Sequence, residues 1–250
     1  RSMTYYPGED MVTMSGKKVF LTKGENKFLS RKFIVDTKKE KLFSEDEITS
    51  TIYLESGNSI FSKSPVFISS KKVEIYEKSG TIIYSEDVSL FQGDTKLNAE
   101  KVEIGNNKSI NISGKAKLNF TNGEKNISIG GNEIKIDPTQ NSLYIDGEGM
   151  ISEGENSLSG KSLIVEFDDN NQISRVTGKN KIEFKRKGIS GKSEKVVWKF
   201  SEKIITFINN AQLIKTDSGR SKGAEIQFSI EDEKVLIKSA EGKRSETKID

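Results

Sequence analysis

The sequence predicts an all-β fold: a repetitive antiparallel architecture of about seven units, in which two opposed sheets joined along one seam form a long folded trough. Three observations predict it. Apolar residues alternate as in strands along nearly all of the 250 residues, and the spacing typical of helices is essentially missing. Gly, Asn, Asp and Ser recur at short intervals between these runs, whereas only 3 prolines occur. Finally, one short pattern returns about every thirty residues, which is typical of a repeat architecture.

The repeated pattern has an apolar or small residue at its start, a small residue two positions later, and apolar residues five and seven positions after the start. The stretch LNAEKVEI, Leu97 to Ile104, is one copy. The other copies are FLSRKFIV from Phe28, ISSKKVEI from Ile68, IGGNEIKI from Ile129, LSGKSLIV from Leu158, SKGAEIQF from Ser221 and a looser ISGKSEKVVW from Ile189. These starts define about seven units. The longest step, from 28 to 68, contains the stretch 52–65, which we expect to form an added hairpin.

The odd spacing inside each copy predicts a bend. In a straight strand, Leu97 and Val102 would lie on opposite faces, because they are an odd number of positions apart. We therefore expect a bulge or corner three or four positions after the start, which returns both halves of the strand to one interior. The small residue before it, here Ala99, is expected to let the backbone bend without a clash. Strands that turn such a corner pass from one sheet to a facing sheet.

Most copies follow a partner strand and a short turn. The turns include TKGEN, QGDT, TNGE and KRKG. We interpret KRKG (185–188) as a solvated turn rather than a binding site. Gly16, Gly114 and Gly178 precede partner strands and are expected in tight turns with positive φ. Each unit is therefore a strand, a hairpin, a second strand and a turn into the next unit.

The composition narrows the classes of function. The chain carries 40 basic and 37 acidic residues in an interspersed pattern, which indicates no dedicated nucleic-acid surface. Cysteine and histidine are both absent, which excludes disulfides, thiolate or imidazole metal sites and Ser-His-Asp triads. No pair of carboxylates stands out for acid–base chemistry. We therefore expect a protein that is not an enzyme and that uses no cofactor and no metal.

The stretch SGTIIYSEDVSLFQGDTKLNAEKVEI (79–104) resembles the periplasmic lipopolysaccharide-transport proteins of the LptA/OstA family. The residues that carry the family's strand, Gln-Gly hairpin and Ala-Glu-Lys-Val phrase are Val88, Leu90, Gln92, Gly93, Leu97, Ala99, Glu100, Lys101 and Val102. A second copy at 170–198 has Gly178 and Gly191 in the family's glycine places. The periodic pattern extends the resemblance over roughly residues 11–238, which we expect to form a single elongated jellyroll between polar terminal segments, 1–10 and 239–250.

The resemblance implies a slightly twisted OstA-like β-jellyroll, V-shaped in section, that holds the acyl chains of lipid A in its apolar interior, while head groups and sugars protrude from the open edge. It implies a periplasmic location, with any signal or anchor segment absent from the sequence given. We expect a lipopolysaccharide-binding transport protein that bridges the inner and outer membranes. The long repeat near 42–81 departs from a single LptA-like module, so the membrane-anchored LptC-like subunit and the LptD-like amino-terminal domain are alternatives. A structural or adhesive β-solenoid, whose coils span about 20–25 residues, is the alternative from another class.

The expected acyl-chain lining consists of apolar residues at inward positions of the repeat. They are Leu97, Val102, Ile104, Ile112, Leu118, Phe120, Ile134, Ile136, Leu163, Val165, Phe167, Ile182, Phe184, Val196 and Trp198. The alternative is that the same residues form a closed, dry core. The expected partners are lipopolysaccharide, through lipid A, and other jellyroll proteins of the Lpt type or further copies of this chain. Such proteins would dock head to tail, because unpaired edge strands at the ends of a repeat stack invite strand addition. No nucleic-acid partner is expected.

Overall fold

The computed structural model describes residues 2–6, 8–54, 60–62, 64–137, 139–217, 219–238 and 246–248. These residues form 19 strands and no helix, so the prediction of an all-β fold is confirmed. Within the same ranges there is accordingly no helix that could span a membrane. The chain divides into two compact units, the first comprising residues 1–120 and 133–140 and the second residues 121–132 and 141–250. Strands β10 (Ile110–Asn122) and β11 (Lys125–Asp137) contribute residues to both.

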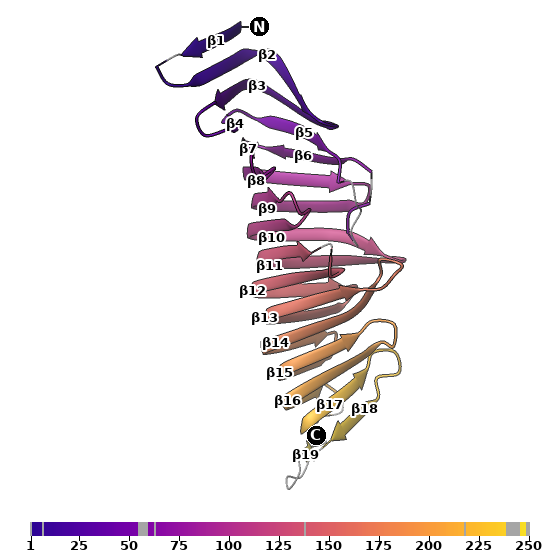
Figure 1. The fold of residues 1–250 in the computed structure, drawn as a ribbon. Helices are drawn as coiled ribbons and strands as arrows, with labels where there is room; N and C mark the ends of the chain where they lie inside the picture. The colour runs from indigo at the N-terminus through magenta and orange to yellow at the C-terminus, as the bar shows by residue number, and fades with distance from the viewer. Residues whose placement is uncertain are drawn as a thin grey trace. The chain divides into compact units, whose positions relative to one another are not determined.

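The first unit is a stack of antiparallel strands (Figure 1). It contains β1 (Ser2–Tyr6), β2 (Met11–Lys23), β3 (Asn26–Asp36), β4 (Lys41–Ser44), β5 (Ile48–Ile52), β6 (Val66–Ser70), β7 (Lys72–Tyr76), β8 (Ile82–Gln92) and β9 (Thr95–Ile104). The pairs β1–β2, β2–β3, β8–β9 and β9–β10 join neighbours along the chain. Between β3 and β8, the short strands β4 and β7 continue one half of the sheet and β5 and β6 the other half.

The second unit repeats the same arrangement. It contains β12 (Ser142–Glu153), β13 (Asn156–Phe167), β14 (Ile173–Arg186), β15 (Ile189–Lys199), β16 (Ile204–Lys215), β17 (Gly219–Ser229), β18 (Val235–Lys238) and β19 (Glu246–Lys248). From β12 to β17 each strand pairs antiparallel with the next, and β17 then pairs with both β18 and β19.

A corner divides each long strand into two arms. Between Ser85 and Val88, two residues of β8 lie opposite one residue of β9, so the ladder shifts register. Those two residues, Glu86 and Asp87, have positive φ angles of 65° and 54°. The same left-handed pair recurs in β10, β12, β14 and β16, as Gly114–Lys115, Gly147–Glu148, Asn180–Lys181 and Asn209–Asn210. Left-handed backbone is costly for most side chains. Its recurrence at every second strand from β8 to β16 therefore identifies the corner as a structural device rather than a local irregularity.

The predicted change of face is confirmed in β9. Leu97 and Val102 are both fully buried, whereas Glu100 and Lys101 lie exposed between them on the outside of the corner. The left-handed residues themselves lie in the partner strand β8.

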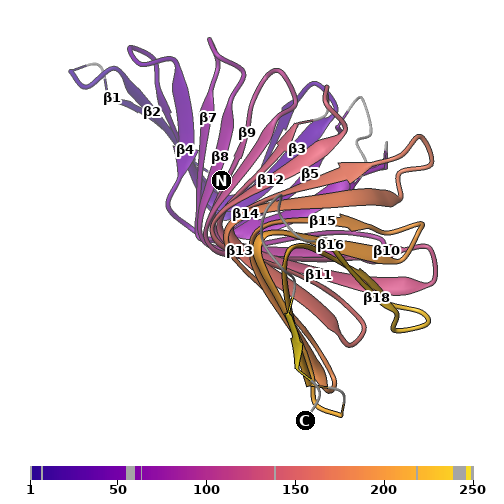
Figure 2. The same ribbon diagram turned by 90° about the horizontal axis from the view of Figure 1, so that it is seen from below.

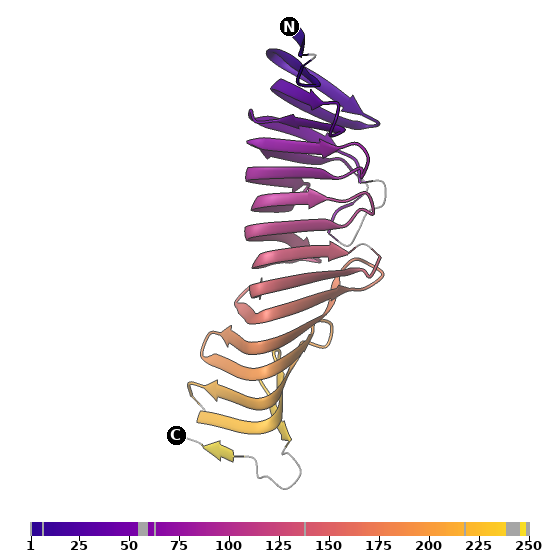
Figure 3. The ribbon, with the colours of Figure 1, turned by 60° about the vertical axis from the view of Figure 1, so that its left-hand side comes forward.

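The two arms of each long strand belong to two facing wings (Figures 2 and 3). In each unit we call first wing the arms that meet at hairpins such as 23–26, 92–95, 153–156, 186–189 and 215–219. The arms on the other side of the corner form the second wing. In the second unit, the second wing ends at the loops 167–173, 199–204 and 229–235. The tip of each wing is thus the end of its strands that lies farthest from the corner.

Glycines near the corner make room for side chains. The expected tight turns at Gly16 and Gly178 are wrong, because both residues lie inside strands, β2 and β14, and neither has a positive φ. Gly114 has a φ of 77°, but it lies at the corner of β10 rather than between strands. A Cβ at Gly178 would lie 2.8 Å from side-chain atoms of three residues, among them Leu163 and Val196. Gly178, like Gly160 and Gly191, therefore gives space to apolar side chains, whereas Gly114 and Gly147 supply left-handed backbone at the corner.

The stretch 52–65 is not a hairpin in the part that the structure describes. Ile52 ends β5, the described residues 53–54, 60–62 and 64–65 belong to no strand, and residues 55–59 and 63 lie outside the described ranges. Phe61 is nevertheless fully buried. The hairpin 92–95 contacts this stretch, because Gln92 Oε1 accepts a hydrogen bond from the Ser62 amide at 2.7 Å. The excursion thus packs against the first wing of the first unit.

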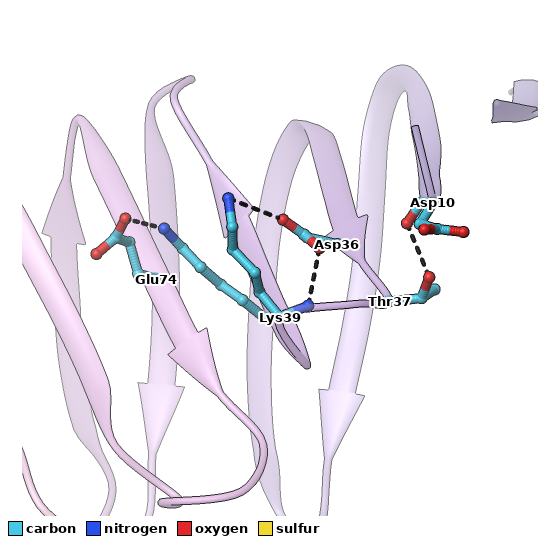
Figure 4. A network of polar contacts seen from close by, with 6 residues as sticks. Asp10, Asp36, Thr37, Lys39 and Glu74 are labelled. Atoms are coloured by element: carbon cyan, nitrogen blue, oxygen red, sulfur yellow. Dashed lines mark hydrogen bonds and ion pairs between the residues drawn. The ribbon is translucent and has the colours of Figure 1, made fainter. Parts of the chain in front are cut away.

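Polar contacts hold the tip of the second wing in the first unit (Figure 4). The Thr37 hydroxyl donates to the carbonyl of Asp10 at 2.8 Å. The Asp36 carboxylate accepts from the amide of Lys39 at 2.9 Å and lies 3.3 Å from its ammonium group. These contacts fix the turn between β3 and β4.

Candidate lipid-binding interior

The fifteen predicted lining residues all face the interior of the unit to which they belong. The first unit holds Leu97, Val102, Ile104, Ile112, Leu118, Phe120, Ile134 and Ile136, and the second holds Leu163, Val165, Phe167, Ile182, Phe184, Val196 and Trp198. The most exposed of them, Phe167, is 8 % exposed. Side chains therefore fill the space between the wings. The role of these residues in binding lipid stays a prediction.

Aromatic side chains join the two wings of the second unit. Phe184 lies on the first wing, and its ring centroid is 6.3 Å from that of Trp198, 6.1 Å from that of Phe207 and 6.2 Å from that of Phe228, all on the second wing. All four residues are at most 1 % exposed. Edge-on and tilted contacts at this spacing are favourable for aromatic rings. The cluster is an apolar surface that is continuous across the V.

Phe207 and Phe228 belong to this interior but were not in the predicted lining. Phe228 stands at the last apolar position of the copy that starts at Ser221, so the pattern already placed it inward. Phe207 lies in a partner strand, where its alternation with Ile205 carries the same signal. Both could have been found by extending the pattern to every partner strand.

The interior of the first unit contains two buried hydroxyl groups. Tyr84 lies on the second wing and is fully buried, and Ser50 lies on the first wing and is 4 % exposed. Burial raises the pKa of Tyr84 far above its ordinary value, and the nearby Ser50 hydroxyl offsets part of that rise. Among the described residues neither hydroxyl has a hydrogen-bond partner of normal geometry. The apolar interior of the first unit thus includes two uncharged hydroxyl groups, those of Tyr84 and Ser50.

A polar residue ends the inward face of the first wing at most hairpins. After the inward residues Ile182 and Phe184, the next inward position is Arg186. The equivalent positions in other hairpins are Lys23, Gln92, Asn122, Glu153 and Lys215. The interpretation of KRKG as a purely solvated turn is therefore wrong for Arg186, which is half-buried and donates from Nη1 to the carbonyl of Ile230. The alternation with Ile182 and Phe184 was the signal for this inward direction.

An apolar groove lies on the outer face of the first unit. Phe67 and Phe91 stack there with centroids 5.2 Å apart, and Phe20 and Leu29 line the groove as well. Its volume is about 390 Å³, and Thr49 and Thr51 between the larger side chains form its floor. Phe20, Phe67 and Phe91 are 64 %, 42 % and 49 % exposed. This groove opens on the opposite side of the sheet from the predicted lining.

The geometry defines a class of protein: an all-β jellyroll of bent strands whose facing wings enclose a continuous apolar interior bordered by polar residues. Comparison with known families identifies the family. The model of the LptA/(LptD N-terminal domain) LPS transport protein family matches residues 67–171 and 128–234. The two matches together cover more than half of the chain, so the chain belongs to this family.

Among solved structures, the chain is similar to LptH from Pseudomonas aeruginosa, described as the LptA homologous periplasmic component of the conserved lipopolysaccharide transport device. The two share 20 % sequence identity with a TM-score of 0.43, over 48 % of this chain and 94 % of that one. A search of the curated proteins finds no match.

Proposed function

We propose that this protein is a periplasmic lipopolysaccharide-binding protein that shelters the acyl chains of lipid A between the wings of its jellyroll. It does so as part of a bridge that carries the lipid from the inner to the outer membrane. The observation that carries the proposal is the apolar interior that continues across both wings in each unit, in a chain that belongs to a lipopolysaccharide-transport family.

Burial of hydrocarbon supplies the binding energy. Each methylene group that leaves water contributes roughly 0.8 kcal/mol. In the proposed complex, acyl chains lie against Phe184, Trp198 and their neighbours, which now contact one another across the V. The wings separate to admit the acyl chains, while the hydrogen bonds between neighbouring strands near the corner remain in place. Acyl chains that enter replace contacts between side chains of the two wings, and the loss of those contacts offsets part of the free energy gained by burying the lipid. The lipid is therefore not bound so tightly at one repeat that it cannot move to the next.

Transfer along a bridge requires contacts between the ends of such jellyrolls. Strand β1 is exposed along its length and pairs with β2 on one side. A strand edge of this kind accepts a further strand from another chain. We propose that this end docks head to tail with another jellyroll of the same pathway or with a second copy of this chain.

Photo-crosslinking from the interior tests the lipid-binding proposal. A benzophenone amino acid replaces Phe120 or Phe184, which face the two interiors, and in a control it replaces Ile214, which is outward-facing and 36 % exposed. After incubation with lipopolysaccharide, we expect lipid adducts from the interior positions and few from position 214. Lipid adducts from position 214 alone, or no adducts from any position, would overturn the proposal.

A further inference from the structure

Two polar contacts in the second unit join the tip of the first wing to the tip of the second. Arg186, at the end of β14, donates from Nη1 to the carbonyl of Ile230, the residue that follows β17. The Lys215 ammonium, at the end of the first-wing arm of β16, lies 3.2 Å from the carbonyl oxygen of Glu233 and 3.4 Å from its carboxylate. Since both wing tips lie at the far ends of the strands from the corner, these contacts span the open edge of the V.

A third contact has the same character. Asn122 belongs to the hairpin between β10 and β11, and its Oδ1 accepts a hydrogen bond at 2.8 Å from the amide of Ile173, where the second-wing arm of β14 begins. Its position, like those of Arg186 and Lys215, is the last inward one before a hairpin turn. We call these three side chains with their partners the latch. Each contact joins a side chain at the tip of the first wing to a residue in, or directly beside, a loop of the second wing. Such contacts contribute little individually and exchange readily with water.

A polar pocket adjoins the latch at the rim of the first wing. Lys125, Glu153, Asn156 and Arg186 line it, and its volume is about 450 Å³. Asn156 is 9 % exposed, and its Oδ1 is buried without a hydrogen-bond partner among the described residues. The Lys125 ammonium lies 3.1 Å from Glu153. Glu155 lines the pocket as well, so its two cations lie near two carboxylates, and Lys125 is paired with one of them, Glu153. Arg186 contacts a neutral carbonyl instead, and it shares the pocket with the unsatisfied acceptor of Asn156.

We propose that this rim is a latched entry site for the phosphorylated sugar head group of a lipid, an inference that rests on the proposed function. In the empty protein, the latch holds the wing tips together. When the lipid arrives, its phosphate takes Arg186 from the Ile230 carbonyl, and a sugar hydroxyl donates to Asn156 Oδ1. The wings then part and the acyl chains enter from the side.

The chemistry of the side chains favours this ligand class. The planar guanidinium group of Arg binds phosphate through two parallel hydrogen bonds, which are stronger than a single bond to a neutral carbonyl. A phosphate can therefore displace the Ile230 carbonyl from Arg186. A buried acceptor without a donor is costly, and a hydroxyl-rich head group removes that cost at Asn156. A plain fatty acid has one anionic group and no hydroxyl array, and it satisfies fewer of these groups.

A cross-link across the open edge tests the latch. The chain has no cysteine, so a short, thiol-cleavable bifunctional reagent reacts only with an introduced pair. The test pair is Lys215→Cys with Glu233→Cys, and the control pair is Lys192→Cys with Glu183→Cys, which replaces an outward ion pair of 2.8 Å between β15 and β14. We expect the test cross-link to slow lipopolysaccharide uptake by about tenfold or more, equivalent to 1.4 kcal/mol. Cleavage of the reagent restores the rate, and the control cross-link leaves it unchanged.

The head-group site has its own variant. Wild-type protein is expected to bind lipopolysaccharide more tightly than its enzymatically dephosphorylated form, and Arg186→Gln is expected to lose most of that preference. Arg175→Gln is the control, because Arg175 lies on the same strand but is exposed beside Glu166. Equal preference in both variants overturns the head-group site, and unchanged uptake in the cross-linked test pair overturns the latch. Wild-type protein that binds no lipopolysaccharide at all overturns the proposed function instead.

Discussion

The ring of Phe207 occupies the space that a side chain at position 191 would need. A Cβ at Gly191 would lie 2.4 Å from Cζ of Phe207, closer than real Cβ atoms approach other heavy atoms. Gly191 belongs to the first wing, and Phe207 to the second wing, on the neighbouring strand. The contact shows that the wings of the second unit touch directly next to the corner. The glycine in this copy of the repeat is therefore required by packing between the wings.

Gly191→Ala is expected to destabilise the second unit. The added methyl group pushes Phe207 out of its place, and overpacking of this kind costs about 1–3 kcal/mol. Urea unfolding followed by the fluorescence of Trp198, the one tryptophan of the chain, measures the change within this unit. Ser190→Ala, one position away on the other face, serves as the control and should change the unfolding free energy by less than about 0.5 kcal/mol. Equal stability of the two variants would contradict direct contact between the wings.

The left-handed pairs at the corner predict opposite effects for two neighbouring lysines. Lys181 has a φ of 55°, so Lys181→Gly relieves backbone strain and should be neutral or stabilise by up to about 1 kcal/mol. Lys179 lies in the regular ladder of β14, and Lys179→Gly should destabilise by about 0.5–1 kcal/mol. Both side chains are exposed, so little packing is lost in either variant. Thermal unfolding of the two variants side by side measures the difference, and a larger loss for Lys181→Gly would contradict the corner geometry.

The sequence predicts where each strand bends, but it does not predict which residues adopt the left-handed backbone at the corner. The odd spacing between Leu97 and Val102 places the turn at Glu100 and Lys101, where the structure has it. It does not place the left-handed residues, because Glu86 and Asp87 lie in the partner strand and do not resemble a glycine turn. Since the register between two strands decides which residues are in excess, alternation along a single strand cannot show it.

The sequence likewise predicts the inward positions of the candidate site but not the contacts between the tips of the two wings. Alternation along each strand correctly placed residues such as Phe184 and Trp198 inside. The direction of Arg186 was also present in that alternation, but a Lys-Arg-Lys-Gly run by itself is typical of a solvated turn. The partners of Arg186 and Lys215 come from loops about 20 to 45 positions away, so the latch depends on how far each strand reaches beyond the corner. The length of each arm beyond the corner is set by the register of the assembled sheet, so a single strand does not reveal these contacts.

The aromatic cluster is expected to be the main source of stability in the second unit. Phe184→Ala removes a fully buried ring that contacts both wings, and such truncations cost about 3–5 kcal/mol. Met150→Ala is the control in the same unit, because Met150 is 43 % exposed, and it should cost less than about 1 kcal/mol. Urea unfolding monitored by circular dichroism measures both. A small effect of Phe184→Ala would show that the interior is not packed across the V.

The pair of Glu74 with Lys41 gives the first unit a pH-dependent contribution. Burial raises the pKa of the Glu74 carboxyl, but the hydrogen bond and the charge of Lys41 outweigh it and hold the pKa below its ordinary value of 4.5. Because the folded pKa is lower than the unfolded one, the stabilisation is present above pH 4.5 and is lost as the pH falls through the folded pKa. We expect Glu74→Gln to lose no more than about 1 kcal/mol at pH 7. Its unfolding free energy should also depend less on pH below 4.5, and an unchanged acid dependence would contradict the pairing.

Quenching of Trp198 tests most directly whether lipid lies between the wings. Trp198 is the one tryptophan of the chain and is 1 % exposed beside Phe184, so its fluorescence reports on the interior. Lipid A with brominated acyl chains quenches a tryptophan only at short range. We expect strong quenching of Trp198 at saturating lipid, and weak quenching when Trp198→Phe is combined with Ile214→Trp on the outer face. Saturable binding that leaves Trp198 unquenched but quenches the tryptophan at position 214 would contradict it.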